Sequence, residues 1–428
     1  MAAKKREVRW DKLDNTAHLF PVIAGEGMSN VYRISVTLKE PILPGYLKEA
    51  LDKVLPWFDV FRVRLRKGIF WYYFEENTKP APRILEEHSY PNQYISPNKN
   101  NHYLFRVSYY KNRINLEVFH VLTDGTGAIQ FLRELTYQYL RLVHPELLSA
   151  VPDTLCSDTS LNKEDSYLKN YKRSHAKGYR TRRAFLIKGE KLRPLEMGIM
   201  HGYMKVEDLK RVSKQYGLTI NEYLVATFIY SVWKECLHET PGKRPICVAV
   251  PVNLRPYYHS ITTKNFFVMV SAAFEPTKEQ YTFAEIAAIT AESLRSQINP
   301  EHLEDLFAYN VSNEKNFALR AVPLFVKNLA IRFVYQTSAL ANTTTITNIG
   351  PIAVRDEYKP YIERFHAFLS MSKGQNLKGL VCSYDGTLVF NFSSTLVDTS
   401  VQRCFFAHLA EEGISVELET NGVYDEKM

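Results

Sequence analysis

The chain has 428 residues, of which 45% are hydrophobic and 23% are charged, so it is long enough for a sizeable core and its composition excludes a disordered protein. Its most apolar run, Leu224 to Trp233, is too short to span a bilayer. The net charge of +8 comes mainly from one segment rather than from a folded face with interleaved aromatic residues, which argues against nucleic-acid binding.

The first part of the chain alternates between strand and helix patterns. Apolar residues recur with period two from Asn30 to Lys39, and Pro44 to Phe58 then shows helical spacing. Two hairpins are predicted next, with turns at Lys67-Gly68 and near Lys111-Asn112. The second strand of the second hairpin ends at His120, and a helical pattern begins shortly after Asp124-Gly125.

Residues 150–195 lose this regularity and are rich in serine, aspartate, lysine and asparagine, so we expect them to cross between two halves of the protein. From Lys169 to Arg193, ten basic residues stand against one glutamate. This basic segment is either a solvated linker or a surface that attracts an anionic partner, such as the phosphates of a coenzyme or an acidic carrier protein.

A second ordered half follows. Thr219 and Glu222 form a capping box at the start of an apolar helix, and Gly217 closes the preceding helix. Further strands are expected at 245–253, 265–275, 343–350, 380–384 and 387–394, and further helices at 282–298 and 400–413. We therefore predict a mixed α/β (α+β) protein with two lobes, residues 1–160 and 198–428, joined by a basic linker at 161–197.

Two observations bear on the cellular compartment. The amino-terminal stretch "MAAKKREVRWDKLD" has basic residues but no apolar segment behind them, so we expect no secretory signal and a cytoplasmic protein. The five cysteines are scattered, without CxxC or histidine-rich spacing, which argues against disulfides and against a structural metal site.

The most informative motif is H-x-x-x-D-G at His120, Asp124 and Gly125, for which only about 0.02 chance matches are expected in a chain of this composition. A histidine at a strand end is suited to act as a general base, which takes a proton from a hydroxyl during its attack. The alternative is a half-buried histidine that is hydrogen-bonded to backbone.

Asp124 also has alternatives. Its carboxylate could orient the imidazole of His120, or it could cap the helix that begins near Thr126 by accepting backbone N–H bonds. Gly125 and Gly127 permit a close approach of backbone to a ligand, although glycine in a turn usually indicates only a positive φ.

The motif "HVLTDG" resembles the active-site motif of the chloramphenicol-acetyltransferase-like superfamily, which includes condensation domains, wax ester synthases and alcohol acyltransferases. The segments "KLDNTAHLFP", "PVNLRP" and "TNIGPI" are similar to those of its free-standing alcohol O-acetyltransferase-like branch, and the resemblance covers nearly the whole chain. It implies two related lobes with an active-site tunnel between them, His120 as the base, and Asp124 pointing away from His120 to pair with Arg255.

Two departures from the family's patterns argue against two of its subclasses, the peptide-forming condensation domains and the plant acyltransferases. Phe119 stands where many peptide-forming condensation domains have a second histidine, and the D-F-G-W-G segment of the plant acyltransferases is absent. Thr347 and Asn348, at a strand end before Gly350, are candidate oxyanion or donor contacts. The alternative for these two residues is ordinary turn chemistry, because Asn-x-Gly-Pro is a common turn sequence.

The resemblance implies an acyltransferase that moves an acyl group from acyl-CoA, used as a co-substrate with no bound cofactor, to a small hydroxyl-bearing acceptor or, less favoured, an amine. A second hypothesis replaces acyl-CoA by the thioester of an acyl carrier protein, which would dock on the basic segment. A third is a non-catalytic protein that binds an acylated carrier; the intact His120 argues against it.

Overall fold

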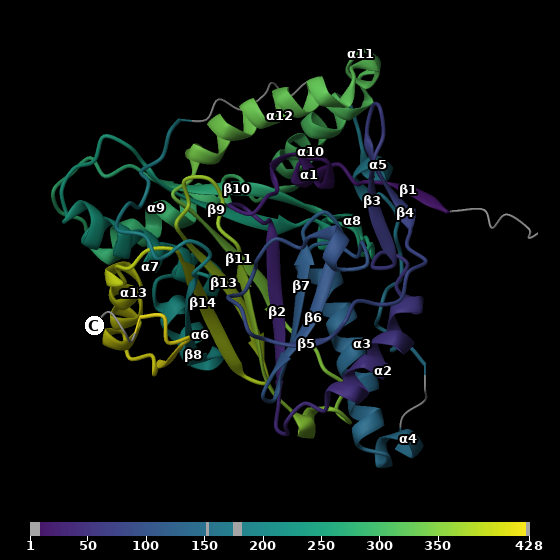
Figure 1. Cartoon of the computed structure of the whole chain (residues 1–428). Helices are drawn as coiled ribbons and strands as arrows, with labels where there is room; N and C mark the ends of the chain where they lie inside the picture. Colours follow the sequence, from purple (N-terminus) through teal and green to yellow (C-terminus); the bar gives the residue numbers. More distant parts are fainter. Residues whose placement is uncertain (1–8, 151–153, 174–181, 425–428) are drawn as a thin grey trace, which may run out of the picture.

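The structure, a computed structural model of the chain, describes residues 9–150, 154–173 and 182–424. It is a mixed α/β protein with two lobes, as the sequence predicts (Figure 1). The first lobe is built on a five-stranded sheet. Its strands, in spatial order, are β12 (Ile362–Leu369), β2 (Val31–Leu38), β7 (Arg113–Phe119), β6 (Phe105–Tyr110) and β5 (Leu85–Glu86). Helices α2 (Pro44–Val54) and α3 (Gly125–Val143) pack together beside this sheet.

The second lobe is built on a seven-stranded sheet. Its strands, in spatial order, are β10 (Phe267–Phe274), β9 (Ile246–Asn253), β11 (Thr344–Pro351), β13 (Leu377–Tyr384), β14 (Thr387–Ser394), β8 (Gly198–Lys205) and β15 (Glu417–Thr420). Strand β11 runs parallel to both of its neighbours, and the other pairs are antiparallel. One face carries the helices α6 (Val206–Gln215), α7 (Ile220–Leu237), α9 (Phe283–Arg295) and α13 (Ser400–Glu411).

Smaller elements complete the fold. A three-stranded sheet contains β1 (Trp10–Lys12), β4 (Tyr72–Glu76) and β3 (Val63–Lys67). The remaining α-helices are α1 (Phe20–Ile23), α4 (Glu146–Ala150), α5 (Ser166–Asn170), α8 (Arg255–Tyr258), α10 (Pro300–Lys315), α11 (Phe317–Ala321) and α12 (Leu324–Ser338). Short 3-10 turns lie at Thr16–His18, Leu55–Trp57, Pro97–Lys99, Ala339–Ala341 and Lys359–Tyr361.

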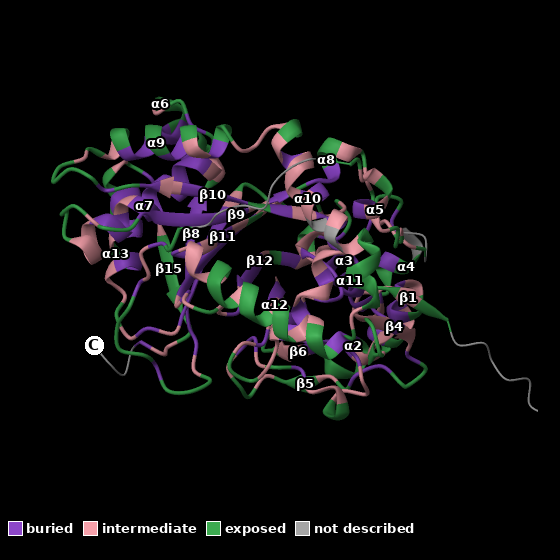
Figure 2. Cartoon of the chain, turned by 90° about the horizontal axis from the view of Figure 1, so that it is seen from above, coloured by how far each residue is buried: buried purple, intermediate pink, exposed green. Residues whose placement is uncertain are grey.

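The two faces of the seven-stranded sheet belong to different cores. On β13, Leu377 and Val381 pack in the core beneath the helices of the second lobe, whereas Leu380 and Cys382 join the core of the first lobe. Because side chains alternate along a strand, the second face of this sheet is the interface between the lobes. Figure 2 colours buried residues purple, and much of β9 and β12 has this colour.

Strand β12 belongs to the second half of the sequence but to the sheet of the first lobe. It lies far along the sequence, yet it pairs antiparallel with β2 and so completes the sheet of the first lobe. The predicted boundaries at 160 and 197 stay a prediction, and the first lobe contains this strand in addition. Within the described ranges, no helix combines the length and the apolar character needed to cross a membrane.

Candidate active site

His120 directly follows β7 and is held on several sides. Its backbone N–H donates to the carbonyl of Asn30 at 3.0 Å. Its ring stacks on Phe20, with centroids 4.6 Å apart, and Tyr32 and Phe267 contact it at 5.0 and 5.7 Å. Aromatic packing of this kind fixes the plane of the imidazole.

Asn265 determines which nitrogen of His120 carries the proton. Nδ2 of Asn265 donates to the carboxylate of Asp14 at 3.0 Å and to the carbonyl of His120 at 3.3 Å. The carboxamide oxygen therefore faces Nδ1 of His120, at 3.1 Å. Because this oxygen can only accept, Nδ1 carries the hydrogen and Nε2 keeps a lone pair. Nε2 makes no hydrogen bond to a described residue, and His120 is partly exposed.

Asp14 anchors this arrangement from the amino-terminal segment. Its side chain also accepts from the backbone N–H groups of Ala17 at 2.8 Å and Asn265 at 3.3 Å. Burial raises the pKa of Asp14 to about 7, while the hydrogen bonds from Asn265 and Ala17 oppose that shift. A series of hydrogen bonds from Asp14 through Asn265 to His120 thus links the first lobe, the start of β10 and the imidazole.

The environment of His120 favours the neutral imidazole. Burial lowers the pKa of His120, its own backbone carbonyl and the charge of Asp124 raise it, and the amine of Lys378 lowers it. A neutral imidazole is the form that accepts a proton. The balance of these effects lowers the pKa of His120 and so favours the neutral imidazole at neutral pH.

Lys378 is a charged residue on the lobe interface. It lies on β13 on the same face as Leu380 and Cys382, and its side chain is buried. Nζ donates to Oγ of Ser372 at 2.6 Å, and no ion pair joins it to a carboxylate within the described ranges. Burial lowers the pKa of Lys378 to about 7.

Asp124 is fully engaged by the scaffold. It is the N-cap of α3 and accepts from the backbone N–H of Thr126 at 3.2 Å and of Gly127 at 3.4 Å. Two nitrogens of Arg255 donate to its two oxygens at 2.8 and 3.0 Å, and the N–H of Phe266 donates at 3.0 Å. None of its hydrogen bonds goes to His120. The structure therefore brings Asp124 and Arg255 together and leaves His120 to Asn265.

Arg255 ties this carboxylate to the second lobe. Besides Asp124, its guanidinium donates to the carbonyl oxygens of Thr262 at 2.9 Å and Lys264 at 2.7 Å. These bonds fix residues 262–266, the segment that presents Asn265 to the imidazole. Asp124 and Arg255 thus hold both sides of the site.

The two glycines after Asp124 differ in their surroundings, and neither has a positive φ. A Cβ on Gly127 would lie 2.1 Å from Oγ1 of Thr123 and 2.4 Å from the carbonyl of Thr263, so only glycine fits there. A Cβ on Gly125 would make ordinary contact with Ile349 at 3.5 Å. Close packing therefore explains why residue 127 is glycine, but it does not explain the glycine at position 125.

Thr347 and Asn348 lie near the end of β11, at an irregular point of its pairing with β13. Oδ1 of Asn348 accepts from the N–H of Gly350 at 2.8 Å, and its exposed side chain lies 3.4 Å from Asn221. This hydrogen bond to Gly350 agrees with the alternative that Asn348 belongs to an ordinary turn. Ile346 points into the core of the second lobe, so alternation places Thr347 on the interface face, where it stays a candidate contact.

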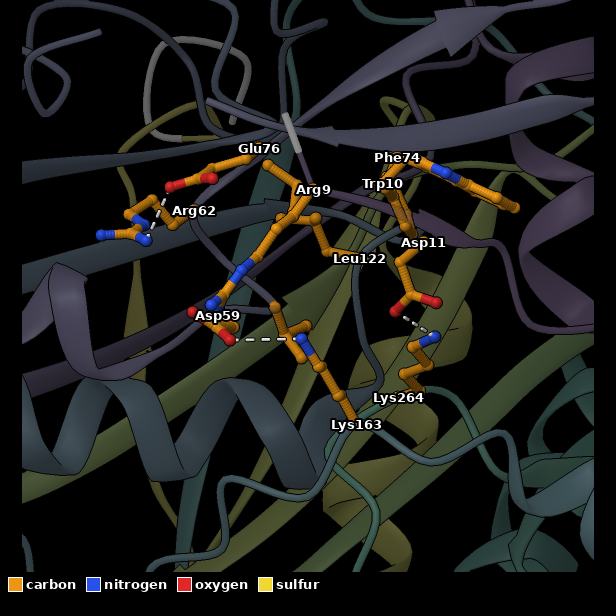
Figure 3. Close-up of a pocket in the computed structure, with 12 residues that line it drawn as sticks. Arg9, Trp10, Asp11, Asp59, Arg62, Phe74, Glu76, Leu122, Lys163 and Lys264 are labelled. Atoms are coloured by element: carbon orange, nitrogen blue, oxygen red, sulfur yellow. Dashed lines mark hydrogen bonds and ion pairs between the residues drawn. The ribbon is translucent and has the colours of Figure 1, made fainter. Parts of the chain in front are cut away.

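A pocket on the outer side of the site loop is shown in Figure 3. Leu122 and Lys264 border it, but His120 does not. Three ion pairs line it, Lys264–Asp11 at 2.8 Å, Lys163–Asp59 at 3.2 Å and Arg62–Glu76 at 2.9 Å. Among the described residues, no cluster of three or more histidine, cysteine or acidic side chains is placed to hold a metal ion.

Sequence reasoning missed three residues of this site, Asp14, Asn265 and Lys378. Asp14 lies inside the segment "KLDNTAHLFP", whose resemblance was noted without a role for the aspartate. Asn265 stands in a polar run before β10, and Lys378 interrupts the apolar residues of β13. A charged residue in a buried strand was the signal that could have identified Lys378.

Comparison with known proteins shows the fold. Neither a family model nor a curated protein matches the sequence. Among solved structures, polyketide synthase associated protein 5 from Mycobacterium tuberculosis is similar over 93% of this chain and 97% of its own, with 14% identity and a TM-score of 0.60. The first condensation domain of the CDA synthetase is similar over 94% and 96%, with 12% identity and a TM-score of 0.61.

A third neighbour is TRI101 of F. graminearum, solved with coenzyme A and T-2 mycotoxin. It is similar over 96% of this chain and 99% of its own, with 11% identity and a TM-score of 0.64. Identities this low establish architecture rather than activity. The chain therefore has the two-lobed chloramphenicol-acetyltransferase-like fold of these proteins, as its sequence motifs indicate.

Proposed function

We propose that this chain, with the fold that TRI101 and the condensation domains share, is an acyl-CoA-dependent acyltransferase that acts on a hydroxyl group. The observation that carries the proposal is the imidazole of His120, which has Nδ1–H bound to Asn265 and an Nε2 without a hydrogen-bond partner among the described residues. Coenzyme A is present in the TRI101 complex, which supports a CoA thioester as the donor.

The chemistry follows from that geometry. The acceptor oxygen attacks the thioester carbonyl while Nε2 of His120 takes the hydroxyl proton, which gives a tetrahedral oxyanion. Collapse of this intermediate breaks the carbon–sulfur bond, and the imidazolium returns the proton to the departing sulfur as a free thiol. Positioned proton transfer of this kind contributes about 10²- to 10⁴-fold to the rate.

Other residues have supporting roles in this proposal. Asn265 and Asp14 are positioning residues, because they fix the tautomer and orientation of His120. Asp124 and Arg255 hold the loop that carries the base, and Gly127 allows that loop to pack against residue 263. Thr347 is the proposed contact for the oxyanion or the donor.

The test is an assay of acetyl-CoA with a panel of small alcohols in which free thiol is followed. Thiol release that depends on the alcohol supports the proposal. We expect His120→Ala to keep its fold and to lose at least about 100-fold in kcat. A matched control is His259→Asn, because His259 is exposed with a left-handed backbone that asparagine tolerates. Near-normal turnover by a folded His120→Ala protein would contradict the assignment.

A second candidate donor is the thioester of an acyl carrier protein, and the similarity to condensation domains favours it. At the edges of the basic segment, Lys172 pairs with Glu304 at 3.2 Å and Arg182 with Glu275 at 2.8 Å. Arg173 and Arg183 are exposed and have no ion pair to a described residue. Residues 174–181 lie outside the described ranges.

An assay with each donor distinguishes the two candidates. Turnover with a loaded carrier and none with acetyl-CoA would establish the second. In that case Arg173→Gln with Arg183→Gln should raise KM for the carrier, and salt should diminish the difference. Binding of a loaded carrier without any turnover would instead establish the non-catalytic hypothesis.

A further inference from the structure

Helix α12 exposes an apolar face that the fold does not cover. Phe325, Leu329 and Phe333 recur at intervals of four residues and are 64%, 65% and 74% exposed, and the neighbouring Val334 is 63% exposed. An amphipathic helix of a globular protein normally turns such residues toward the core. Here the helix lies on the outside of the molecule in Figure 1, and its exposed residues are green in Figure 2.

The opposite side of α12 fixes this orientation. Nε of Arg332 donates to the carbonyl of Val22 at 2.9 Å, and the amide of Asn328 donates to the hydroxyl of Tyr72 at 3.0 Å. Leu324 is buried on this inner side, and Ile331 and Tyr335 are partly buried. The helix therefore has an inner face that packs on the protein and a second apolar face that stays exposed.

The tip of the β3–β4 hairpin extends the same surface. Ile69 and Trp71 are 76% and 48% exposed. The backbone N–H of Leu324 donates to the carbonyl of Ile69 at 2.8 Å, and Nζ of Lys327 donates to the carbonyl of Phe70 at 3.0 Å. The two elements thus form one apolar ridge, which we define as Ile69, Trp71, Phe325, Leu329, Phe333 and Val334.

The charge carried by α12 and the segments next to it in the sequence has one sign. The sequence from Lys315 to Arg355 contains no aspartate or glutamate, and its basic residues include Arg320, Lys327 and Arg332. Lys67 adds an exposed cation at the hairpin tip. A protruding apolar ridge with basic residues along it complements a lipid surface with anionic headgroups.

We propose that the apolar ridge docks the protein on an anionic lipid bilayer, with α12 parallel to the membrane plane. The aromatic and aliphatic side chains would enter the boundary between headgroups and acyl chains, while the basic residues attract the headgroups. With 15 residues, α12 is too short to span the bilayer and is suited to lie on it. This proposal does not depend on the catalytic one.

Vesicle sedimentation tests the proposal. We expect the full chain to sediment with phosphatidylcholine vesicles that contain about 30% phosphatidylserine, and far less with phosphatidylcholine alone. The double variant Leu329→Glu with Phe333→Glu should reduce the bound fraction about tenfold, because two carboxylates would meet the anionic surface. Binding of the unmodified chain should also weaken in high salt.

A matched control carries the same charge change away from the ridge. Leu85 on β5 and Leu418 on β15 are 64% and 50% exposed, so Leu85→Glu with Leu418→Glu should sediment like the unmodified chain. Thermal melts establish that both variants are folded. Equal sedimentation of the ridge variant and the unmodified chain, or no sedimentation of the unmodified chain, would overturn the proposal.

Two more measurements separate a membrane from other occupants. Trp71 fluorescence, read as the difference between the unmodified chain and Trp71→Phe, should shift to the blue on binding to vesicles, because an indole that leaves water emits at shorter wavelength. Analytical ultracentrifugation without lipid should give the same mass for the unmodified chain and the ridge variant. A dimer that the ridge variant converts to a monomer would identify an interface between two copies instead and would overturn the proposal.

Discussion

Oδ1 of Asn265 lies 3.1 Å from Nδ1 of His120, and the amide group of Asn265 is itself held by the carboxylate of Asp14. Nδ2 of Asn265 has two acceptors, so rotation of the amide by half a turn would lose both bonds. The protein thereby fixes one tautomer of the imidazole without placing a carboxylate next to it. Asn265 comes from the second lobe and His120 from the first, so the imidazole is held in this way only when both lobes are in place.

Replacement of Asn265 by alanine should therefore act on the histidine rather than on the fold. We expect Asn265→Ala to lower kcat about 10- to 100-fold with little change in KM, because the ring loses its fixed proton position. Nitrogen NMR of the imidazole should show a mixture of tautomers in the variant and one tautomer in the unmodified chain.

The control for that experiment is Asn77→Ala. Asn77 is also buried, and its amide donates to the carbonyl of Asn101 at 2.9 Å rather than to a residue of the His120 site. The Asn77→Ala variant therefore measures how much stability and activity are lost when a buried amide is removed away from the imidazole. If a folded Asn265→Ala protein kept a single tautomer and full turnover, the positioning role would be wrong.

Lys378 should influence the pH dependence of the reaction. Burial and the Lys378 ammonium both lower the pKa of His120, so the acid limb of kcat/KM should lie below the ordinary histidine range. Because the pKa of Lys378 is itself lowered to about 7, its charge is present where His120 titrates. Lys378→Met removes that charge, so the pKa of His120 should rise and the acid limb should move to higher pH.

Lys373 provides a comparison in the same segment, because it is an exposed lysine just before β13. Lys373→Met should leave the acid limb where it is. The pH–rate profiles of both variants test the assignment. A limb that moves to lower pH in Lys378→Met, or does not move at all, would rule out an electrostatic effect of this amine on the imidazole of His120.

Alanine variants of the two glycines in the loop, Gly125 and Gly127, test whether each glycine is needed for packing or for the approach of a ligand. Gly127→Ala places a methyl group against the Thr263 carbonyl, and we expect it to lower stability by about 1–3 kcal/mol and to reduce activity by displacing the loop. Gly125→Ala has room beside Ile349 and should melt like the unmodified chain. If Gly125→Ala is stable but inactive, the backbone at that position approaches a ligand. Equal melting of both variants would contradict the packing argument.

Local patterns in the sequence predicted much of the fold. The hairpin turns at Lys67 and Lys111, the capping box of Thr219 with Glu222 and the left-handed Gly217 are present in the structure, because each depends on residues close together in the chain. Strand β12 was not predicted. Its alternation is readable, but its pairing with β2 joins residues more than 300 positions apart, and no local signal specifies such a partner.

The same distinction applies to the site. H-x-x-x-D-G is a local motif, and its position at a strand end and a helix start was readable from the sequence. The link between Asn265 and His120 spans 145 positions, and the burial that shifts the pKa of Lys378 exists only after the lobes pack together. Pairing of Asp124 with Arg255 was implied only by the resemblance to a family, since 131 positions separate the two.

The pair of Asp124 and Arg255 distinguishes a scaffold from a catalytic relay. Both side chains are buried, and their two hydrogen bonds at 2.8 and 3.0 Å form a bidentate ion pair that links the helix start to the segment carrying Asn265. Removal of either partner leaves a buried charge without compensation. We expect Asp124→Ala and Arg255→Ala each to cost about 3–5 kcal/mol in the free energy of unfolding, and activity should fall along with stability.

The double variant makes the test decisive. When both charges are absent, neither is left buried alone, so the combined loss of stability should be smaller than the sum of the two single losses. Denaturant titrations of the unmodified chain and the three variants give this coupling energy, and kinetics on the same samples show whether activity follows stability. Additive losses would mean that the pair does not act as a unit. A fully stable Asp124→Asn enzyme without turnover would show that the charge of Asp124 serves the imidazole directly, since a relay needs that charge in the reaction and not in the fold.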